Sequence, residues 1–560
     1  MRKAAFILPW LYWIFRILRV LRIFRIFRVF RIFRISRVFR VLRILRVFRM
    51  SRAFRAAMML GAMLAFLPCV AQTELRTEAQ ATFSSGDNTP LWLNANKYGL
   101  SSLDPTNGYL RAGIFRSMEC DSARKVAFAY GADVAVTTHF TSRFVVQQAY
   151  GEMRWLRGLF TIGSKEQPVE LRNQQLSSGP QTLGSNARPY PSVRVALTDY
   201  WDIPFTKGWV GIKGHIAYGI QTDGRWQRDF TEEQSKFTEH TLVHTKAGYL
   251  RIGKPEHAFT AEIGLEMGCQ FGGTSHQFDN GVHATLENDA SPRGFLHAFI
   301  PAGGDSGEGD YKNKEGNHLG SYVLRLNYNR PAWRLSLYGD HFFEDSSQML
   351  FLEYDGYGKG DEWNEWVDNR WFLYDLRDMM LGAEVQLKRQ KWVTNIVAEY
   401  IYSKHQSGPV YHDRTPSLSD HIGGMDNYYN HYIHTGWQHW GMVNGNPLYR
   451  SPLYNGDRTI RTLNNRFKAW HLAIAGHPAE GLSYRLMWTW QQGLGTYDQP
   501  STRPEYSRYY LAEAGYDFPQ RSRLAGWSIK AAFGLDHGYW TGNNTGAQFT
   551  VARRLHISGR

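Results

Sequence analysis

The sequence predicts an all-β protein, and more specifically a transmembrane antiparallel β-barrel. Apolar and polar residues alternate along many segments after residue 72. With their flanks these segments run about eight to eleven residues, which is the length of a tilted membrane strand. The connections between them alternate between short and long, as they do in barrels that cross a membrane. The length of this part of the chain indicates on the order of 16 to 20 strands.

The clearest alternation lies at residues 322–329, where every second side chain is apolar and the others include Arg325 and Asn327. After a short turn at 330–332 the pattern resumes at 333–337, which predicts a hairpin with one apolar and one polar face. The same period of two recurs in five further segments: 210–220, 392–400, 484–490, 527–533 and 548–552. Helical patterns are scarce, and the two candidates are 74–81 and 361–380.

Connection length predicts which end of the barrel faces outward. The links at 330–332 and 477–481 are short and typical of periplasmic turns. The polar, aromatic-rich stretches are predicted to be extracellular loops: 223–240, 272–317, 344–378 and 403–468. The chain ends at Arg560 without the terminal aromatic residue common in outer-membrane barrels, so the last strand is expected to close near Leu555, followed by a short tail.

The N-terminal residues differ from this pattern. Residues 1–49 form an Arg-rich, low-complexity leader, which we interpret as a short repeat translated upstream of the true start. Residues 50–71 have the charged, apolar and small-residue regions of a signal peptide, with cleavage expected at Ala71 or Gln72. The neighbours of Cys69 are too large for lipidation there. Residues 72–560 contain no Pro/Ser-rich linker, which favours one barrel domain.

The charge distribution argues against a nucleic-acid partner. The net charge of +15 comes from the leader, because residues 1–55 hold fifteen Arg and one Lys and no acidic residue. Of the 65 Lys and Arg, 49 therefore lie after residue 55, against 50 Asp and Glu. A neutral body lacks the basic surface that binds phosphate backbones.

One segment is specific enough to suggest a family. Residues 88–99, NTPLWLNANKYG, resemble the opening motif of the Wzi family of capsule assembly proteins in Gram-negative bacteria. Further similar segments follow in the order of the family, so that the resemblance spans about residues 75–555: 199–205, 264–268, 317–322, 338–345, 354–356, 426–430, 436–437 and 445–447.

The resemblance implies an outer-membrane barrel of about 18 strands with a small periplasmic helical element near its N-terminus. It also implies a lectin-like protein, without enzymatic activity or cofactor, that attaches or organises capsular polysaccharide at the cell surface. The expected partners are capsular or related polysaccharide, outer-membrane lipid and the outer-membrane assembly machinery. A porin or channel for small solutes is the alternative, and a secreted β-lectin is a third.

Two loops carry residues suited to polysaccharide. Sugars present apolar C–H faces edged with hydroxyls, so flat aromatic rings beside amides and carboxylates can bind them. The alternative for the same rings is that they pack the loops or belong to the interfacial girdle. The predicted binding residues are Trp363 and Trp366 in one loop, and Asp426, Asn427, Tyr428, Tyr429, Asn430, Trp437 and Trp440 in the other.

Catalytic and metal patterns are weak. The spacing of His431, His434 and His439 fits no zinc motif, and no metal site is expected. The acidic residues near His341 are interpreted as groups at a strand end, and no nucleophile elbow or phosphate-binding loop is present. Cys120 and Cys269 leave a disulfide open as an alternative.

Overall fold

The computed structural model describes residues 73–121, 124–279, 282–301, 316–344, 351–353, 370–372, 377–406, 410–411, 422–423 and 425–557. The 1–49 leader and the 50–71 signal peptide therefore lie outside the described residues, as do Trp363 and Trp366.

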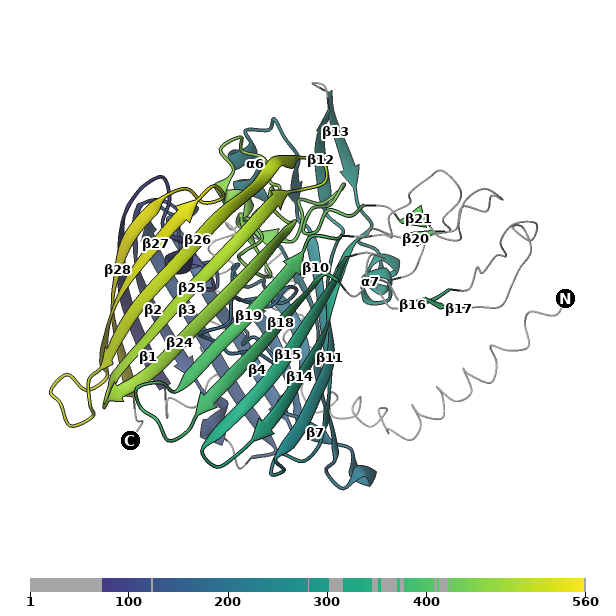
Figure 1. The fold of residues 1–560 in the computed structure, drawn as a ribbon. Helices are drawn as coiled ribbons and strands as arrows, with labels where there is room; N and C mark the ends of the chain where they lie inside the picture. The colour runs from purple at the N-terminus through teal and green to yellow at the C-terminus, as the bar shows by residue number, and fades with distance from the viewer. Residues whose placement is uncertain are drawn as a thin grey trace, which may run out of the picture. The chain divides into compact units, whose positions relative to one another are not determined.

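The described chain forms one large antiparallel sheet that is rolled into a barrel (Figure 1). Its 19 strands are β1 (Thr73–Ser85), β2 (Thr106–Arg116), β3 (Val126–Thr138), β4 (Phe144–Trp155), β5 (Gly158–Ser164), β6 (Ser192–Leu197), β7 (Trp201–Asp202), β8 (Val210–Ile220), β10 (Leu242–Ile252), β11 (Phe259–Phe271), β14 (Asn317–Asn329), β15 (Trp333–Glu344), β18 (Met379–Leu387), β19 (Asn395–Ser403), β24 (Phe467–Ala479), β25 (Leu482–Gly495), β26 (Pro500–Asp517), β27 (Trp527–Gly538) and β28 (Asn544–Ile557).

The barrel is closed because the first strand pairs with the last. β1 runs antiparallel to β28 from Thr73↔Ile557 to Ser85↔Thr545. β6 and the two-residue β7 both pair with β8, in separate stretches, so together they occupy one position in the wall. The wall thus has 18 positions, and the predicted closed barrel is confirmed. β28 ends at Ile557, close to the expected Leu555.

Side chains alternate across the wall, with apolar groups outside and polar groups inside. On β14, Leu324 is 39% exposed, whereas Arg325 and Asn327 are buried in the lumen. The pattern at 322–329 therefore marks a strand whose oily face is the outer one, as lipid requires. Aromatic side chains are exposed at the strand ends with the short connections, as in an interfacial girdle: Trp155, Trp201, Trp209, Phe259 and Trp392.

The connections divide the barrel into a long-loop end and a short-turn end. The turn at 330–332 and the link before Leu482 lie at the short-turn end, together with the 3-10 helices η2 (Met118–Asp121) and η3 (Pro204–Thr206). The remaining elements belong to the long-loop connections: α5 (Leu91–Asn94), α6 (Gly224–Thr231), β9 (Phe237–Glu239), β12 (Thr274–Asp279), β13 (Val282–Glu287), α7 (Pro292–Phe299), β16 (Phe351–Glu353), β17 (Arg370–Phe372), β20 (Val410–Tyr411), β21 (Ile422–Gly423), β22 (Gln438–His439), β23 (Met442–Val443) and η5 (Pro452–Tyr454).

Both helix predictions were wrong where the chain is described. Residues 74–81 lie in β1, and 370–372 and 379–380 are strand as well. At the short-turn end, the described residues before β3 provide only the 3-10 helix η2 where a small helical element was expected. None of the described helices is long and apolar enough to cross a membrane.

The fold also separates the two cysteine positions after the leader. Cys269 is buried near the long-loop end of β11, and residue 120 lies in η2 at the short-turn end. A disulfide requires Cα atoms within about 7 Å. The length of the strands keeps these positions farther apart, so this fold does not allow the bridge.

Candidate functional site

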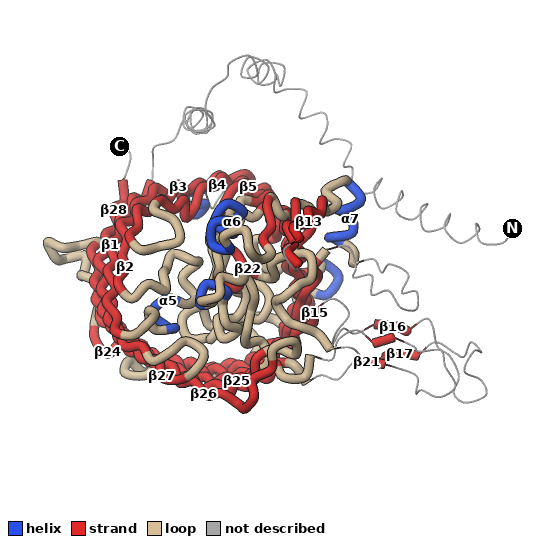
Figure 2. Tube along the Cα trace, turned by 90° about the horizontal axis from the view of Figure 1, so that it is seen from above, coloured by secondary structure: helices blue, strands red, loops and turns tan. Residues whose placement is uncertain are grey.

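The lumen of the barrel is filled by three connections that fold inward from the long-loop end, and we call these three segments the plug: residues 86–105, 165–191 and 425–466. Figure 2 shows the strands as a ring with loop segments and α5 inside it. The main apolar core lies here, where Trp92 and Leu176 of the plug pack in one cluster with Phe342 of the wall. The lumen is thus occupied by protein.

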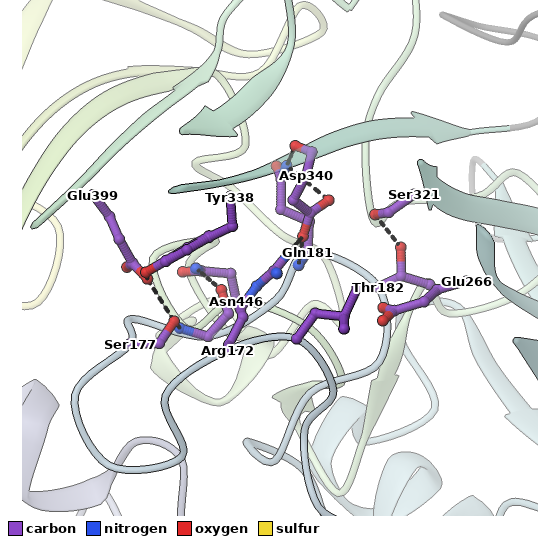
Figure 3. A network of polar contacts seen from close by, with 12 residues as sticks. Arg172, Ser177, Gln181, Thr182, Glu266, Ser321, Tyr338, Asp340, Glu399 and Asn446 are labelled. Carbon is purple, nitrogen blue, oxygen red and sulfur yellow. Dashed lines mark hydrogen bonds and ion pairs between the residues drawn. The ribbon is translucent and has the colours of Figure 1, made fainter. Parts of the chain in front are cut away.

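A polar network ties the plug segment 165–191 to the far wall (Figure 3). The Arg172 guanidinium forms an ion pair with Asp340 on β15, and both side chains are almost fully buried, at 1% and 0% exposure. The same carboxylate accepts a hydrogen bond from the Gln181 backbone N–H at 3.0 Å. On β19, Glu399 accepts hydrogen bonds from the Ser177 hydroxyl at 2.6 Å and the Tyr338 hydroxyl at 2.6 Å. This segment therefore spans the lumen and is anchored opposite the strands from which it starts.

The three plug segments also bind one another. The indole N–H of Trp437 donates to the Thr182 carbonyl oxygen at 2.8 Å, and the Tyr449 hydroxyl lies 2.9 Å from Gln181 Oε1. The Asn96 side-chain amide donates to the Ser178 carbonyl oxygen at 2.9 Å. Because each segment is bonded to another one and to the wall, the plug behaves as part of the barrel core.

Seven of the nine predicted binding residues lie in the plug segment 425–466. Tyr428, Tyr429 and Trp437 are 0%, 1% and 1% exposed, and the two tyrosines pack edge-on against Phe342. Their rings are covered on all sides, which is the packing role that the sequence left as the alternative. Direct stacking of sugar on these three rings would require the plug to move.

The polar members of the same stretch hold the loop together. The Asn427 Oδ1 atom accepts from the Asn430 and Asn465 side-chain amides at 2.7 and 2.6 Å. Asn430 also donates to the Thr462 carbonyl oxygen at 2.9 Å, and Asp426 Oδ1 accepts from the Asn427 backbone N–H at 2.7 Å. These contacts leave few of their hydrogen-bonding atoms for a ligand.

Trp440 differs from the other predicted aromatic residues in the described part of this loop, because its ring remains partly exposed at the long-loop end. It belongs to a group that we call the mouth cluster: Trp440, Trp226, Phe230 and Arg188. The Trp226 and Phe230 rings stack at 5.0 Å on α6, and Trp226 lies 6.3 Å from Trp440. The Arg188 guanidinium lies 4.3 Å from the Trp440 ring centroid. Flat rings beside a cation and hydroxyl groups form a surface that suits a sugar face.

Trp226, Phe230 and Arg188 were not among the residues predicted from the sequence. The first two are four residues apart on α6, which places them on the same face of the helix. That spacing was readable within the predicted loop 223–240. Arg188 could not be found in this way, because it reaches Trp440 across about 250 residues of sequence.

Two of the three histidines considered as metal ligands bind backbone groups, and the His434 ring packs 5.3 Å from that of His431. His431 Nδ1 accepts from the backbone N–H groups of Ile433 and His434, both at 3.1 Å. His439 Nδ1 lies 2.9 Å from the Arg188 carbonyl oxygen. Within the described ranges, no group of three or more His, Cys, Asp or Glu side chains could hold a metal ion. Glu344, from the acidic group near His341, accepts the Tyr429 backbone N–H at 2.8 Å.

Burial gives this part of the plug a pH dependence. It lowers the pKa of Lys236, beside His431, to about 7, and the pKa of His434 to about 3. A folded state with lowered pKa values binds fewer protons than the unfolded state, so its stability falls as the pH falls. The window is about 10.5 to 7 for Lys236 and about 6.5 to 3 for His434.

We therefore expect amide hydrogen exchange in residues 425–437 to become faster, relative to the strands, when the pH falls from 8 to 5. Exchange rates are corrected for the intrinsic effect of pH. The His434→Gln variant should lose much of this change, since its side chain no longer titrates. An equal pH response in both proteins would contradict the assignment.

A cavity of about 340 Å³ lies in the lumen between plug segment 165–191 and the wall strands β5 to β11. It extends from Trp437 in the plug to Thr198 beyond the short-turn end of β6. We call it the wall cavity. Its size is at the lower end of the range of small-molecule pockets, about 300 to 1,000 Å³.

The comparisons with known proteins support the fold. No family model matches the chain, and no curated protein sequence matches it. A solved structure of Wzi from Escherichia coli, described as an outer membrane protein involved in group 1 capsule assembly and a carbohydrate-binding β-barrel, has a TM-score of 0.51 at 13% identity. It covers 86% of this chain and 85% of that one. The resemblance to Wzi is confirmed at the level of the fold.

Besides Wzi, two solved barrels from Pseudomonas aeruginosa match over most of the chain. OccK5 (OpdH) has a TM-score of 0.42 at 8% identity and covers 87% of this chain and 98% of that one. OprD has a TM-score of 0.41 at 9% identity and covers 88% and 96%.

Proposed function

We propose that the protein is an outer-membrane barrel that retains capsular or related polysaccharide at the cell surface, without enzymatic activity. The long loops would face outward and the short turns the periplasm, as in other barrels of this kind. The similarity in fold to Wzi, whose description names carbohydrate binding and capsule assembly, supports this function.

The observation that carries the proposal is the combination of a filled lumen with a partly exposed aromatic cluster at its mouth. The plug segments contact one another and are anchored to the wall by the Arg172–Asp340 ion pair. They fill the lumen with packed protein instead of leaving an open channel. At the mouth of the barrel, the partly exposed rings of Trp440 and Trp226 lie beside the buried Arg188. A filled barrel with a sugar-compatible mouth suits retention better than transport.

The first test is a clean deletion strain in which cell-attached and medium-released polysaccharide are quantified side by side. We expect glycan to move from the attached to the released fraction, and complementation with the full chain to reverse the change. An unchanged ratio in a strain without a related copy would argue against retention.

Conductance distinguishes this proposal from the porin alternative. We expect the purified protein to insert into planar lipid bilayers without steady single-channel conductance, because the plug fills the lumen. Insertion is verified independently by protease protection of reconstituted vesicles. Stable ohmic channels in the wild-type protein would favour a diffusion porin.

A further inference from the structure

The side of the wall cavity that is formed by the barrel strands carries small residues. Small residues line it from two neighbouring strands: Ser192 on β6, and Ala217 and Gly219 on β8. Larger inward residues fill the lumen elsewhere, such as Phe342 on β15. Small residues on these two neighbouring strands leave space that the plug segment 165–191 covers but does not fill.

The charges that line the wall cavity are mostly paired. Lys165 binds both oxygens of Glu152 at 2.7 Å, and Lys213 binds those of Glu170 at 2.7 and 2.9 Å. Arg188 pairs with no carboxylate among the described residues, but its guanidinium donates to the Thr141 hydroxyl at 2.7 Å. Arg194 has neither kind of partner in the described part of the chain. It points inward from β6, since its neighbours Val193 and Val195 are exposed on the outer face.

Within the described part of the chain, the Arg194 guanidinium makes no hydrogen bond or ion pair. The carboxylates that act on it, Glu152 and Glu170, are each held by a lysine. A half-buried cation without an anion is costly, because burial removes part of its hydration. A guanidinium presents paired N–H groups that match the two oxygens of a carboxylate.

A hydrogen-bond acceptor faces the same cavity from β11. Glu266 is 2% exposed and its Oε1 atom accepts from the Tyr249 hydroxyl at 2.8 Å. Its Oε2 atom has no hydrogen-bond partner within the described residues. Three strand spacings of about 4.8 Å separate β6 from β11, so a small body with hydroxyl groups can lie between Arg194 and Glu266.

We propose that the wall cavity binds a monoanionic sugar acid, such as a uronate, with its carboxylate on Arg194 and a hydroxyl group donating to Glu266. Lys165 and Lys213 are already held by Glu152 and Glu170, so the single charge of Arg194 matches a monoanion better than a dianion such as phosphate. The cavity reaches the short-turn end at Thr198, so the ligand enters from that side. Arg188 lines this cavity as well as contacting Trp440 in the mouth cluster, but the proposed ligand binds at Arg194 and Glu266 and does not depend on polysaccharide retention.

The test is isothermal titration of the full chain, purified in detergent, with D-galacturonate, D-galactose and inorganic phosphate. We expect galacturonate to bind and the other two to bind at least tenfold more weakly. The Arg194→Gln variant should bind galacturonate about tenfold more weakly or worse, because a charge-assisted pair is lost. The variant should fold normally, since Arg194 has no partner that would be left unpaired.

Two further variants make the result specific. Ala217→Leu, which pairs with Arg194 across β6 and β8, keeps every charge and should abolish binding by filling the cavity. Arg503→Gln removes the same charge from an exposed position and should bind as the wild type does. No binding of galacturonate to the wild type, equal binding to Arg194→Gln, or equal binding of phosphate would each overturn the proposal.

Discussion

Cells that carry Trp226→Ala together with Trp440→Ala are expected to release surface polysaccharide into the medium while the barrel still reaches the membrane. Both rings are partly exposed in the mouth cluster, and neither lies in the wall. If each ring contributes about 1 kcal/mol to binding, losing both weakens the affinity by about thirtyfold. The measurement is the attached-to-released ratio in the complemented deletion strain.

The control for this prediction is Tyr432→Ala, which removes a ring that is 79% exposed in the same plug segment but lies outside the mouth cluster. It should retain polysaccharide as the wild type does. Trp437 is unsuitable as a test residue, because deleting a buried ring costs about 3 to 5 kcal/mol through the cavity left behind. Normal retention in a well-folded Trp226/Trp440 double variant would remove the mouth cluster from the site.

The Arg172→Ala variant is expected to loosen the plug, so that a barrel without measurable ion conductance becomes one that conducts ions. Removing one partner of a buried ion pair leaves the other charge uncompensated and costs about 3 to 5 kcal/mol. The Asp340 carboxylate would be that charge, and among the described residues its remaining hydrogen bonds come from the Gln181 backbone N–H and side-chain amide. We expect intermittent conductance in planar bilayers and a lower unfolding temperature, with β-sheet circular dichroism unchanged below it.

A double variant separates charge from shape in this prediction. Arg172→Ala with Asp340→Ala removes both charges, so it should be more stable than Arg172→Ala alone, although the plug has lost the same anchor. If the single variant is as silent and as heat-stable as the wild type, the ion pair does not hold the plug.

The strands of the barrel wall could be predicted from the sequence, because the alternation of apolar and polar residues is visible within each strand. Alternation at 322–329 and 484–490 predicts strands, since each residue faces either lipid or lumen. The helix predicted for residues 74–81 was wrong for a physical reason. It is rich in helix-forming residues, but pairing on both edges, with β2 and β28, overrides local propensity.

The plug could not be predicted from the sequence, because its contacts join parts of the chain that are far apart in sequence. The ring of Tyr429 is buried against Phe342 by a loop that returns into the lumen. An aromatic-rich loop has the same composition whether it covers the barrel or fills it. The sequence therefore singled out the segment 426–440 for its composition, but it could not show that Tyr428, Tyr429 and Trp437 lie inside the lumen.

The pairing of β1 with β28 has a consequence for how the protein is made. One edge of β1 stays unpaired until Asn544–Ile557, more than 450 residues later in the chain, has crossed the inner membrane. An unpaired edge is an aggregation hazard, and contacts over such separations form late. Asp340 and Glu399, which anchor the plug segment 165–191, also follow their partners Arg172 and Ser177 in the chain by 168 and 222 residues. The plug therefore cannot be fixed in the lumen before β15 and β19 have formed. We expect this chain to depend on holding factors throughout export, and C-terminal truncations to be degraded rather than inserted.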